Sequence, residues 1–246
     1  MERVFFLIFS LSIHAISPPL QDILDYFSIS VEEVKEKWVQ QGKERWEFDE
    51  RYESERECVW PLFERARYIF EIAPTKMHYE YALVFGALLS TAQKRIAYLK
   101  ELLERGIHFD RIVFLTGERL LLDSEKTLCF CTTEKEMIEW VYEHSDLPKK
   151  IPVLFIDSPM QEKRPTTKDT IDSWLETEPK IGSCLAISSQ PYVLYQDSVL
   201  RSVISEEFEI ETVGPQVTGN PTVALILDTV AKEITYRKNT KEKQQP

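Results

Sequence analysis

The most restrictive feature of this sequence is an alternation of short apolar runs with amphipathic stretches, which extends from about residue 79 to about residue 235. Five runs have the length and composition of buried strands, and each is followed by a stretch with helical periodicity. The runs are 81–85, 111–115, 153–156, 184–188 and 208–213, and the helical stretches lie near 91–105, 133–145, 166–176, 192–204 and 219–235. This order predicts a mainly parallel five-stranded sheet with helices on both faces.

Residues 16–78 are highly charged and are predicted to form a helical extension of this α/β domain. Ser30-Val31-Glu32-Glu33 is a capping box, which predicts a helix that continues to about Glu55. A second helix is expected with Pro61 in its first turn, and its apolar face would comprise Leu62, Ala66, Ile69 and Phe70. Three of the five tryptophans, Trp38, Trp46 and Trp60, lie in this extension, where packing is their most common role.

Two further segments are assigned by local pattern. Residues 120–131 are expected to form a β-hairpin inserted after the second strand, with its turn at 123–126, which would place Cys129 and Cys131 in a strand. Residues 237–246 are polar and are expected to be a disordered tail. The four cysteines are too few and too scattered for a disulfide scaffold, and Cys184 is expected in the core.

The N-terminus has the organisation of a secretory signal peptide. A short charged segment precedes the apolar run from Val4 to Ile13, and Ala15 offers a small residue for cleavage. The run is shorter than the roughly 20 residues that cross a bilayer. We therefore expect cleavage after Ala15 and an exported protein, periplasmic or secreted, without a transmembrane span. The structural alternative for residues 1–15 is a buried N-terminal helix.

Composition and motifs exclude several classes of function. The net charge of −11 disfavours binding of duplex nucleic acid, which requires a cationic face. The chain lacks the Gly-x-Ser-x-Gly, Walker and Gly-x-Gly-x-x-Gly motifs. None of the four histidines follows a predicted strand directly, which disfavours a Ser-His-Asp hydrolase and a histidine metal centre, and no metal site is predicted.

Ligands of open α/β sheets bind outside the carboxyl ends of the strands, so the residues after each run are the candidate site. We expect ligand binding by side chains and backbone of Gly86, Arg95, Thr116, Gly117, Arg164, Thr166, Thr167, Ser188, Ser189, Gln190 and Tyr192. Acid–base chemistry would belong to Glu118 or Asp157. Each residue also has a structural explanation, such as a turn or, for Thr166 with Asp169, a capping box.

The segment around Arg164 has the strongest local argument for an anion site. Pro165 biases Arg164 toward an extended backbone, so its side chain is able to reach across the sheet edge. Thr166 is suited to cap the next helix, whose backbone N–H groups would face the same crevice. A guanidinium beside these donors suits a carboxylate or phosphate.

Several motifs of the chain resemble the SanA/ElyC/YdcF-like family of bacterial α/β proteins. The resemblance covers about residues 79–235 and rests on Tyr81–Ala87 with Arg95, on Ile112–Glu118, on Thr133–Met137, on Arg164–Thr170 and on Ser188–Tyr192. Gln190 and Gln196 stand where the family has His and Arg, so the chain looks like a divergent member. The resemblance implies a Rossmann-like three-layer sandwich, a nucleotide-like or S-adenosylmethionine-like ligand and a role in the cell envelope.

Together these observations predict a small-ligand-binding envelope protein with an anionic or nucleotide-like ligand at the carboxyl edge of the sheet. A catalytic version of this function would be a transferase or a hydrolase, and no cofactor is assigned. The alternative is a non-catalytic envelope or interaction protein that uses the Trp-rich helical extension.

Overall fold

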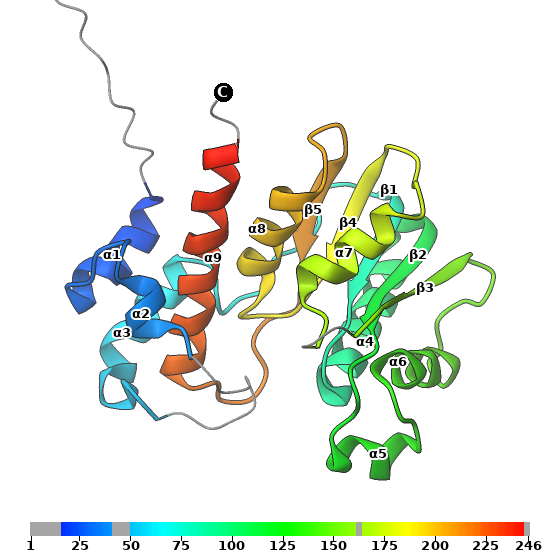
Figure 1. Cartoon of the computed structure of the whole chain (residues 1–246), viewed down its shortest axis with the longest axis horizontal. Helices are drawn as coiled ribbons and strands as arrows, with labels where there is room; N and C mark the ends of the chain where they lie inside the picture. The colour runs from blue at the N-terminus through cyan, green and yellow to red at the C-terminus, as the bar shows by residue number, and fades with distance from the viewer. Residues whose placement is uncertain (1–15, 41–49, 161–163, 244–246) are drawn as a thin grey trace, which may run out of the picture.

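A computed structural model of the chain describes residues 16–40, 50–160 and 164–243. Its centre is a five-stranded sheet in which every neighbouring pair is parallel and the order is β3-β2-β1-β4-β5 (Figure 1). The strands are β1 (His78–Phe85), β2 (His108–Gly117), β3 (Val153–Ser158), β4 (Ser183–Ile187) and β5 (Glu209–Val213). The predicted parallel sheet is confirmed.

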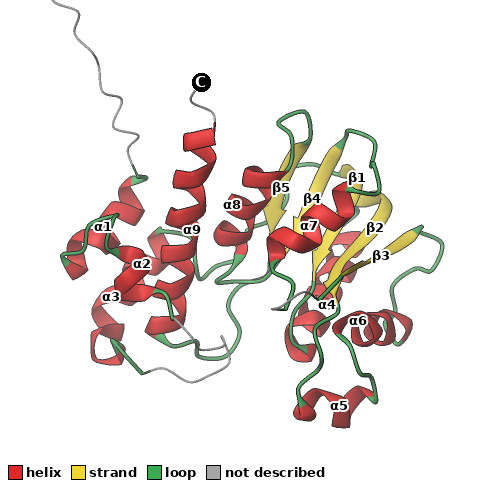
Figure 2. Cartoon of the chain, viewed as in Figure 1, coloured by secondary structure: helices red, strands yellow, loops and turns green. Residues whose placement is uncertain are grey.

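Helices cover both faces of the sheet and complete a three-layer, Rossmann-like α/β fold (Figure 2). The α4 helix (Leu89–Glu104) and the α6 helix (Glu134–Glu143) pack on one face. The α7 helix (Thr167–Leu175) and the α8 helix (Val193–Val203) pack on the other. Because β1 and β4 are neighbours in the sheet while their following helices lie on opposite faces, a crevice opens between the ends of these strands, as is usual at a topological switch point.

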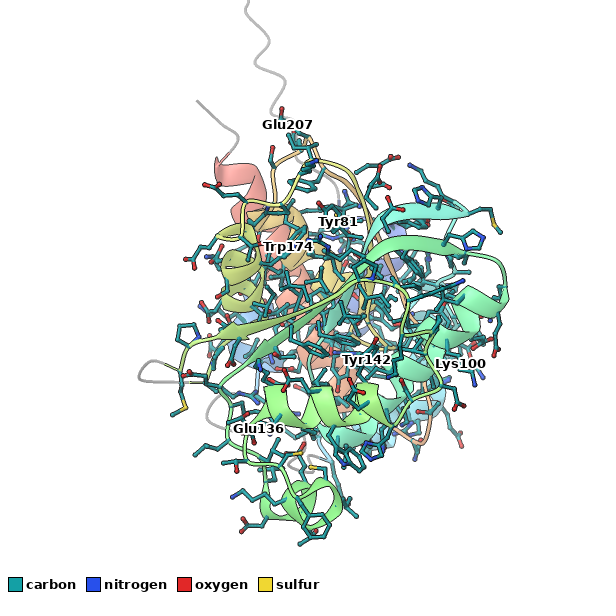
Figure 3. All side chains as sticks on the ribbon, turned by 90° about the vertical axis from the view of Figure 1, so that its right-hand side faces the viewer. Tyr81, Lys100, Glu136, Tyr142, Trp174 and Glu207 are labelled. Atoms are coloured by element: carbon teal, nitrogen blue, oxygen red, sulfur yellow. The ribbon has the colours of Figure 1, made fainter. Side chains whose placement is uncertain are left out.

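The apolar runs are continuous because both faces of each strand are buried. In β1, Ala82 and Val84 belong to the core beneath α4 and α6, whereas Leu83 and Phe85 belong to the core beneath α7 and α8. This alternation follows from the two-residue period of a strand. In Figure 3, Tyr81 and Trp174 lie together on one side of the sheet and Tyr142 lies on the other.

The helical part of the molecule has a core of its own, built around α9 (Val223–Lys243). The short helices α1 (Pro18–Phe27), α2 (Val34–Trp38), η1 (Glu53–Glu55) and α3 (Arg56–Arg65) gather beside α9, which lies between them and α8 (Figure 1). Trp38, with an exposed fraction of 1%, packs in this core. The helical extension and the last helix of the α/β domain therefore form one packed unit.

The first predicted helix of the extension is much shorter than expected. Ser30 N–H donates to the Glu33 carboxylate at 2.9 Å, which is half of the predicted capping box. The helix nevertheless runs only over Val34–Trp38, and the N–H of Gln40 donates to Asp228 of α9 rather than to a helical carbonyl. The tertiary contact with α9 takes the place of the next helical turn. Trp46 lies outside the described residues.

The second helix of the extension begins earlier than predicted, so Pro61 is inside α3 and not in its first turn. The helix also ends earlier, at Arg65, and Arg67 adopts a left-handed backbone conformation with φ of 67°. Ile69 and Phe70 are therefore not part of its apolar face, and Phe70 is exposed.

The predicted hairpin at 120–131 is wrong, because this segment forms helix α5 (Asp123–Cys129). The residues expected to form a turn instead begin the helix, where the Glu125 carboxylate accepts a hydrogen bond from the N–H of Leu122 at 2.9 Å. The β-type contact that remains is a single bridge between Leu120 and Thr133. Cys129 ends the helix instead of lying in a strand, whereas Cys184 is buried in β4 as expected.

The structure describes the C-terminal end of the chain as far as residue 243 but does not describe residues 1–15. The proposed signal peptide, residues 1–15, lies outside the described residues. A disordered tail was expected over residues 237–246. This prediction is wrong for residues 237–243, which belong to α9. Within the described part of the chain, no helix combines the length and apolarity needed to cross a membrane.

Candidate functional site

A cavity of about 380 Å³ lies at the carboxyl edge of the sheet, in the crevice at the ends of β1 and β4. We call it the arginine cavity because Arg95, Arg119 and Arg164 line it. Six of the predicted ligand-binding residues line this cavity: Gly86, Arg95, Arg164, Thr166, Thr167 and Tyr192. The crevice is where an open α/β sheet places its ligand.

The acidic side chain that lines the arginine cavity is that of Glu134, the first residue of α6. Burial raises its pKa to about 7, although the charges of Arg119, Arg95 and Arg164 act to lower it. The side chain is 12% exposed, and its Oε1 atom lies 3.9 Å from Nε of Arg119. Near neutral pH this group is therefore able both to give and to take a proton.

Two glycines make room for the charged groups. A Cβ atom on Gly86 would lie 2.8 Å from Oε1 of Glu134 and 2.9 Å from the backbone oxygen of Leu115, so no larger residue fits beside this carboxylate. A Cβ atom on Gly117 would lie 2.8 Å from Cγ of Pro165. Gly117 thus lets the segment that carries Arg164 approach the end of β2, although Gly117 itself does not line the cavity.

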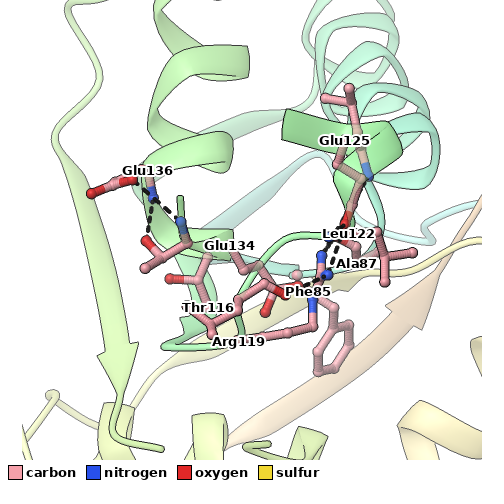
Figure 4. Close-up of polar contacts among 12 residues, drawn as sticks. Phe85, Ala87, Thr116, Arg119, Leu122, Glu125, Glu134 and Glu136 are labelled. Atoms are coloured by element: carbon pink, nitrogen blue, oxygen red, sulfur yellow. Dashed lines mark hydrogen bonds and ion pairs between the residues drawn. The ribbon is translucent and has the colours of Figure 1, made fainter. Parts of the chain in front are cut away.

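Arg119 is held between two acidic side chains. Its Nη1 atom donates to Glu125 Oε2 at 2.8 Å, and its Nη2 atom donates to Glu125 Oε1 at 3.1 Å (Figure 4). Burial acts to raise the pKa of Glu125, but hydrogen bonds from Arg119 and from two backbone N–H groups outweigh it and leave that pKa below its ordinary value. Glu125 is thus an anion that fixes the Arg119 guanidinium, and Glu134 lies on the other side of it (Figure 4).

Arg95 joins the two strands that flank the crevice. Its Nη1 atom donates to the backbone oxygens of Phe85 and Gly86, both at 2.8 Å, at the end of β1. Its Nη2 atom lies 3.4 Å from Oγ of Ser189, which follows β4. Arg95 is 2% exposed, and its guanidinium holds the two sides of the crevice together while the residue lines the cavity.

The N-terminus of α7 meets the cavity through the predicted capping box. Thr166 Oγ1 accepts from the N–H of Asp169 at 3.4 Å, and the Asp169 carboxylate accepts from the N–H of Thr166 at 2.7 Å. Thr166 and Thr167 line the cavity and Arg164 is exposed at its rim. Arg164 and the first residues of α7 thus line the same cavity.

The remaining predicted residues lie outside the arginine cavity. Glu118 is exposed and accepts from the N–H of Met160 at 2.8 Å, while Asp157 is exposed on β3, where burial raises its pKa and the charge of Lys135 opposes that shift. Thr116 and Ser188 are buried, and their hydroxyls donate to the Ile156 oxygen and to the Gln196 side chain. Ser189 and Gln190 line a neighbouring cavity. The two acids proposed as catalytic are therefore not brought to the arginines.

Sequence reasoning missed Arg119, Glu134, Thr170, Tyr195, Gln196 and Lys232 as lining residues. For Arg119 a signal existed, because it lies two residues after the end of β2, at the edge where ligands of open α/β sheets bind. For Glu134 the signal was Thr133-x-x-Glu136, a capping box that starts a helix above the end of β2. Lys232 comes from α9, and no local pattern connects it with the site.

The described residues hold no group of three or more His, Cys, Asp or Glu side chains arranged to bind a metal ion. Comparison of the chain with protein-family models, with curated proteins and with solved structures finds no match to any of them.

Proposed function

We propose that the protein binds a small anionic ligand through a phosphate or carboxylate group in the arginine cavity, and that Glu134 exchanges a proton with this ligand. The observation that carries the proposal is that three arginines and one buried carboxyl group line a single cavity at the carboxyl edge of the sheet. Guanidinium groups recognise phosphate and carboxylate through paired, charge-assisted hydrogen bonds.

The charges of the cavity support an anionic ligand. Four cationic side chains line it: Arg95, Arg119, Arg164 and Lys232. Glu125 balances Arg119, and Asp228 contacts Lys232 at 2.6 Å. The charges of Arg95 and Arg164 act to lower the pKa of the Glu134 carboxyl group. Among the described residues, the cavity is therefore lined by four cationic side chains and one acidic side chain, Glu134, in a chain whose net charge is −11.

Glu134 is the residue suited to acid–base chemistry on a ligand bound there. As a neutral acid it would donate a hydrogen bond to the anion or protonate a leaving oxygen, and as a carboxylate it would accept a proton from an attacking hydroxyl or water. These are the steps of a hydrolase or transferase that acts on a phosphate or carboxylate ester. We therefore assign this role to Glu134 in place of Glu118 and Asp157.

Titration calorimetry with sulfate tests the proposal, because the charge of sulfate does not change between pH 5 and pH 9. The Arg164→Gln variant should bind sulfate about tenfold more weakly than the wild type, which corresponds to the loss of one charge-assisted hydrogen bond. The matched control is Arg111→Gln, which removes an exposed arginine at the start of β2, outside the cavity. Equal affinities of the wild type and both variants, or no binding of sulfate or phosphate to any of them, would contradict the proposal.

A further inference from the structure

The end of helix α5 has a backbone conformation that brings two cysteines close together. Cys129 is the last residue of the helix, Phe130 follows in a left-handed conformation with φ of 55° and ψ of 27°, and Cys131 comes next. In a strand, the Cα atoms of residues two apart are separated by roughly 6.6 Å, which is near the upper limit for a disulfide. A helical backbone of either hand, as at Phe130, shortens this separation to roughly 5.5 Å, a common value in disulfides.

The side chains of these two cysteines are also in contact. Cys131 Sγ donates to the backbone oxygen of Cys129 at 3.2 Å, so the Cys131 side chain turns back toward the end of the helix. Burial raises the pKa of the Cys131 thiol, and interaction with the Cys129 thiol raises it further. The two thiols are therefore neighbours, and the short left-handed turn between them favours a bond from one sulfur to the other.

Solvent reaches this pair through one of its two members. Cys131 is half-buried, whereas Cys129 has an exposed fraction of only 3%. Phe130 between them is 93% exposed, so the turn that carries both thiols lies at the surface of the molecule. Figure 1 shows α5 at the lower edge of the molecule, beyond the ends of the strands. A small oxidant in solution therefore meets Cys131 first.

We propose that Cys129 and Cys131 form a reversible disulfide by exchange with a small disulfide, for which oxidised glutathione is the probe. First, the Cys131 thiol loses its proton and its sulfur bonds to one sulfur of the oxidant, whose S–S bond breaks and releases one glutathione thiol. The Cys129 thiol then loses its proton, and its sulfur bonds to that of Cys131 and displaces the second glutathione thiol. The two cysteines together lose two electrons and two protons, and both are gained by the glutathione.

The pairing depends on the local geometry of the α5 end and not on the proposed anion site. Export, which the N-terminus predicts, would place the pair in a compartment where disulfides persist.

The experiment incubates the full chain with oxidised glutathione at about pH 8.5, because only the thiolate attacks and the raised pKa of Cys131 slows the first step at neutral pH. Mass spectrometry of the intact protein and of its peptides identifies the products. In the wild type, the peptide that contains Cys129 and Cys131 should have lost two hydrogen atoms, and dithiothreitol should restore both thiols. Cys129→Ser should instead retain glutathione on Cys131, because no second thiol displaces it.

The internal control is Cys58, an exposed thiol on α3 with no other cysteine near it in the sequence. It should carry glutathione in the wild type and in Cys129→Ser alike. The proposal is overturned if Cys131 of the wild type retains glutathione as Cys58 does, if Cys129 and Cys131 both stay reduced, or if either of them pairs with Cys58 or Cys184 instead.

Discussion

Two opposing influences act on the pKa of the Glu134 carboxyl group. Burial favours the neutral acid, whereas three guanidinium groups favour the carboxylate, and the outcome is a pKa raised to about 7. A buried carboxyl in a cleft with a strongly shifted pKa is typical of residues that transfer protons. Gly86 is required for this environment, because a side chain at that position would collide with the carboxylate.

The raised pKa of Glu134 makes the stability of the protein depend on pH. Between about pH 4.5 and pH 7 the folded state binds more protons at this residue than the unfolded state, so the free energy of unfolding should fall as pH rises through this window. The loss should be on the order of 3 kcal/mol. In Glu134→Gln this contribution is absent. Urea unfolding at pH 5, 6, 7 and 8 should therefore show that the variant gains stability relative to the wild type as pH rises.

Glu118→Gln is the matched control for this measurement, because it changes an exposed acid outside the cavity. It should keep the pH profile of the wild type. A constant difference in stability between Glu134→Gln and the wild type at all four pH values would show that Glu134 is not the neutral acid described here.

At the scale of the element, α7 shows how a local pattern positions a site. The capping box at its start satisfies backbone N–H groups of the first turn, and Pro165 before it holds the chain extended against Gly117. The capping box and the restriction that Pro165 places on Arg164 are local, whereas the contact with Gly117 of β2 depends on the fold. They determine where Arg164 leaves the backbone relative to the first turn of the helix.

Removal of the N-cap of α7 should destabilise the protein without affecting the guanidinium of Arg164. Thr166→Ala loses the hydroxyl that accepts from the Asp169 N–H, and its free energy of unfolding should fall by about 1 kcal/mol. Thr167→Ala, one residue further on and inside the helix, should change stability by no more than about 0.5 kcal/mol. Urea unfolding midpoints compare the two. Equal losses would mean that the capping bond contributes nothing measurable.

At the scale of the whole molecule, α9 connects the helical part with the site. Its apolar side contributes Val223, Ile226 and Val230 to the helical core, while Lys232 reaches the arginine cavity. Trp38 of the extension is buried in that core, and this burial removes it from any interaction surface. The extension therefore stabilises α9 and, through it, one wall of the site.

We further propose that the protein is exported and that its first 15 residues are removed. Pro18 and Pro19 open α1 and would prevent a helix from continuing out of the apolar run before them. N-terminal sequencing of protein isolated from its native host should begin at Ile16. Recovery of a chain that still begins at Met1 in the cytoplasm would contradict the proposed export.

The sequence by itself determined the strands, most helices of the α/β domain and the helix start at Thr166. Each depends on residues within a few positions of one another: the uninterrupted apolar run of a doubly buried strand, the helical period, or a cap. Local pattern failed where an apolar run is short, since the run that begins at Leu128 and Cys129 suits a strand or a helix. It also failed after Trp38, where the N–H of Gln40 donates to the distant Asp228.

Only the tertiary structure decided which groups meet at the carboxyl edge. Glu134 reaches the arginines because α6 begins above the end of β2 after the α5 insertion, whereas Glu118 points outward to Met160. Gln190, which follows β4, likewise donates to the backbone oxygens of Arg67 and Phe70 in the chain after α3. Contacts between segments so far apart depend on how layers pack, and packing is a property of the whole fold that no local pattern contains.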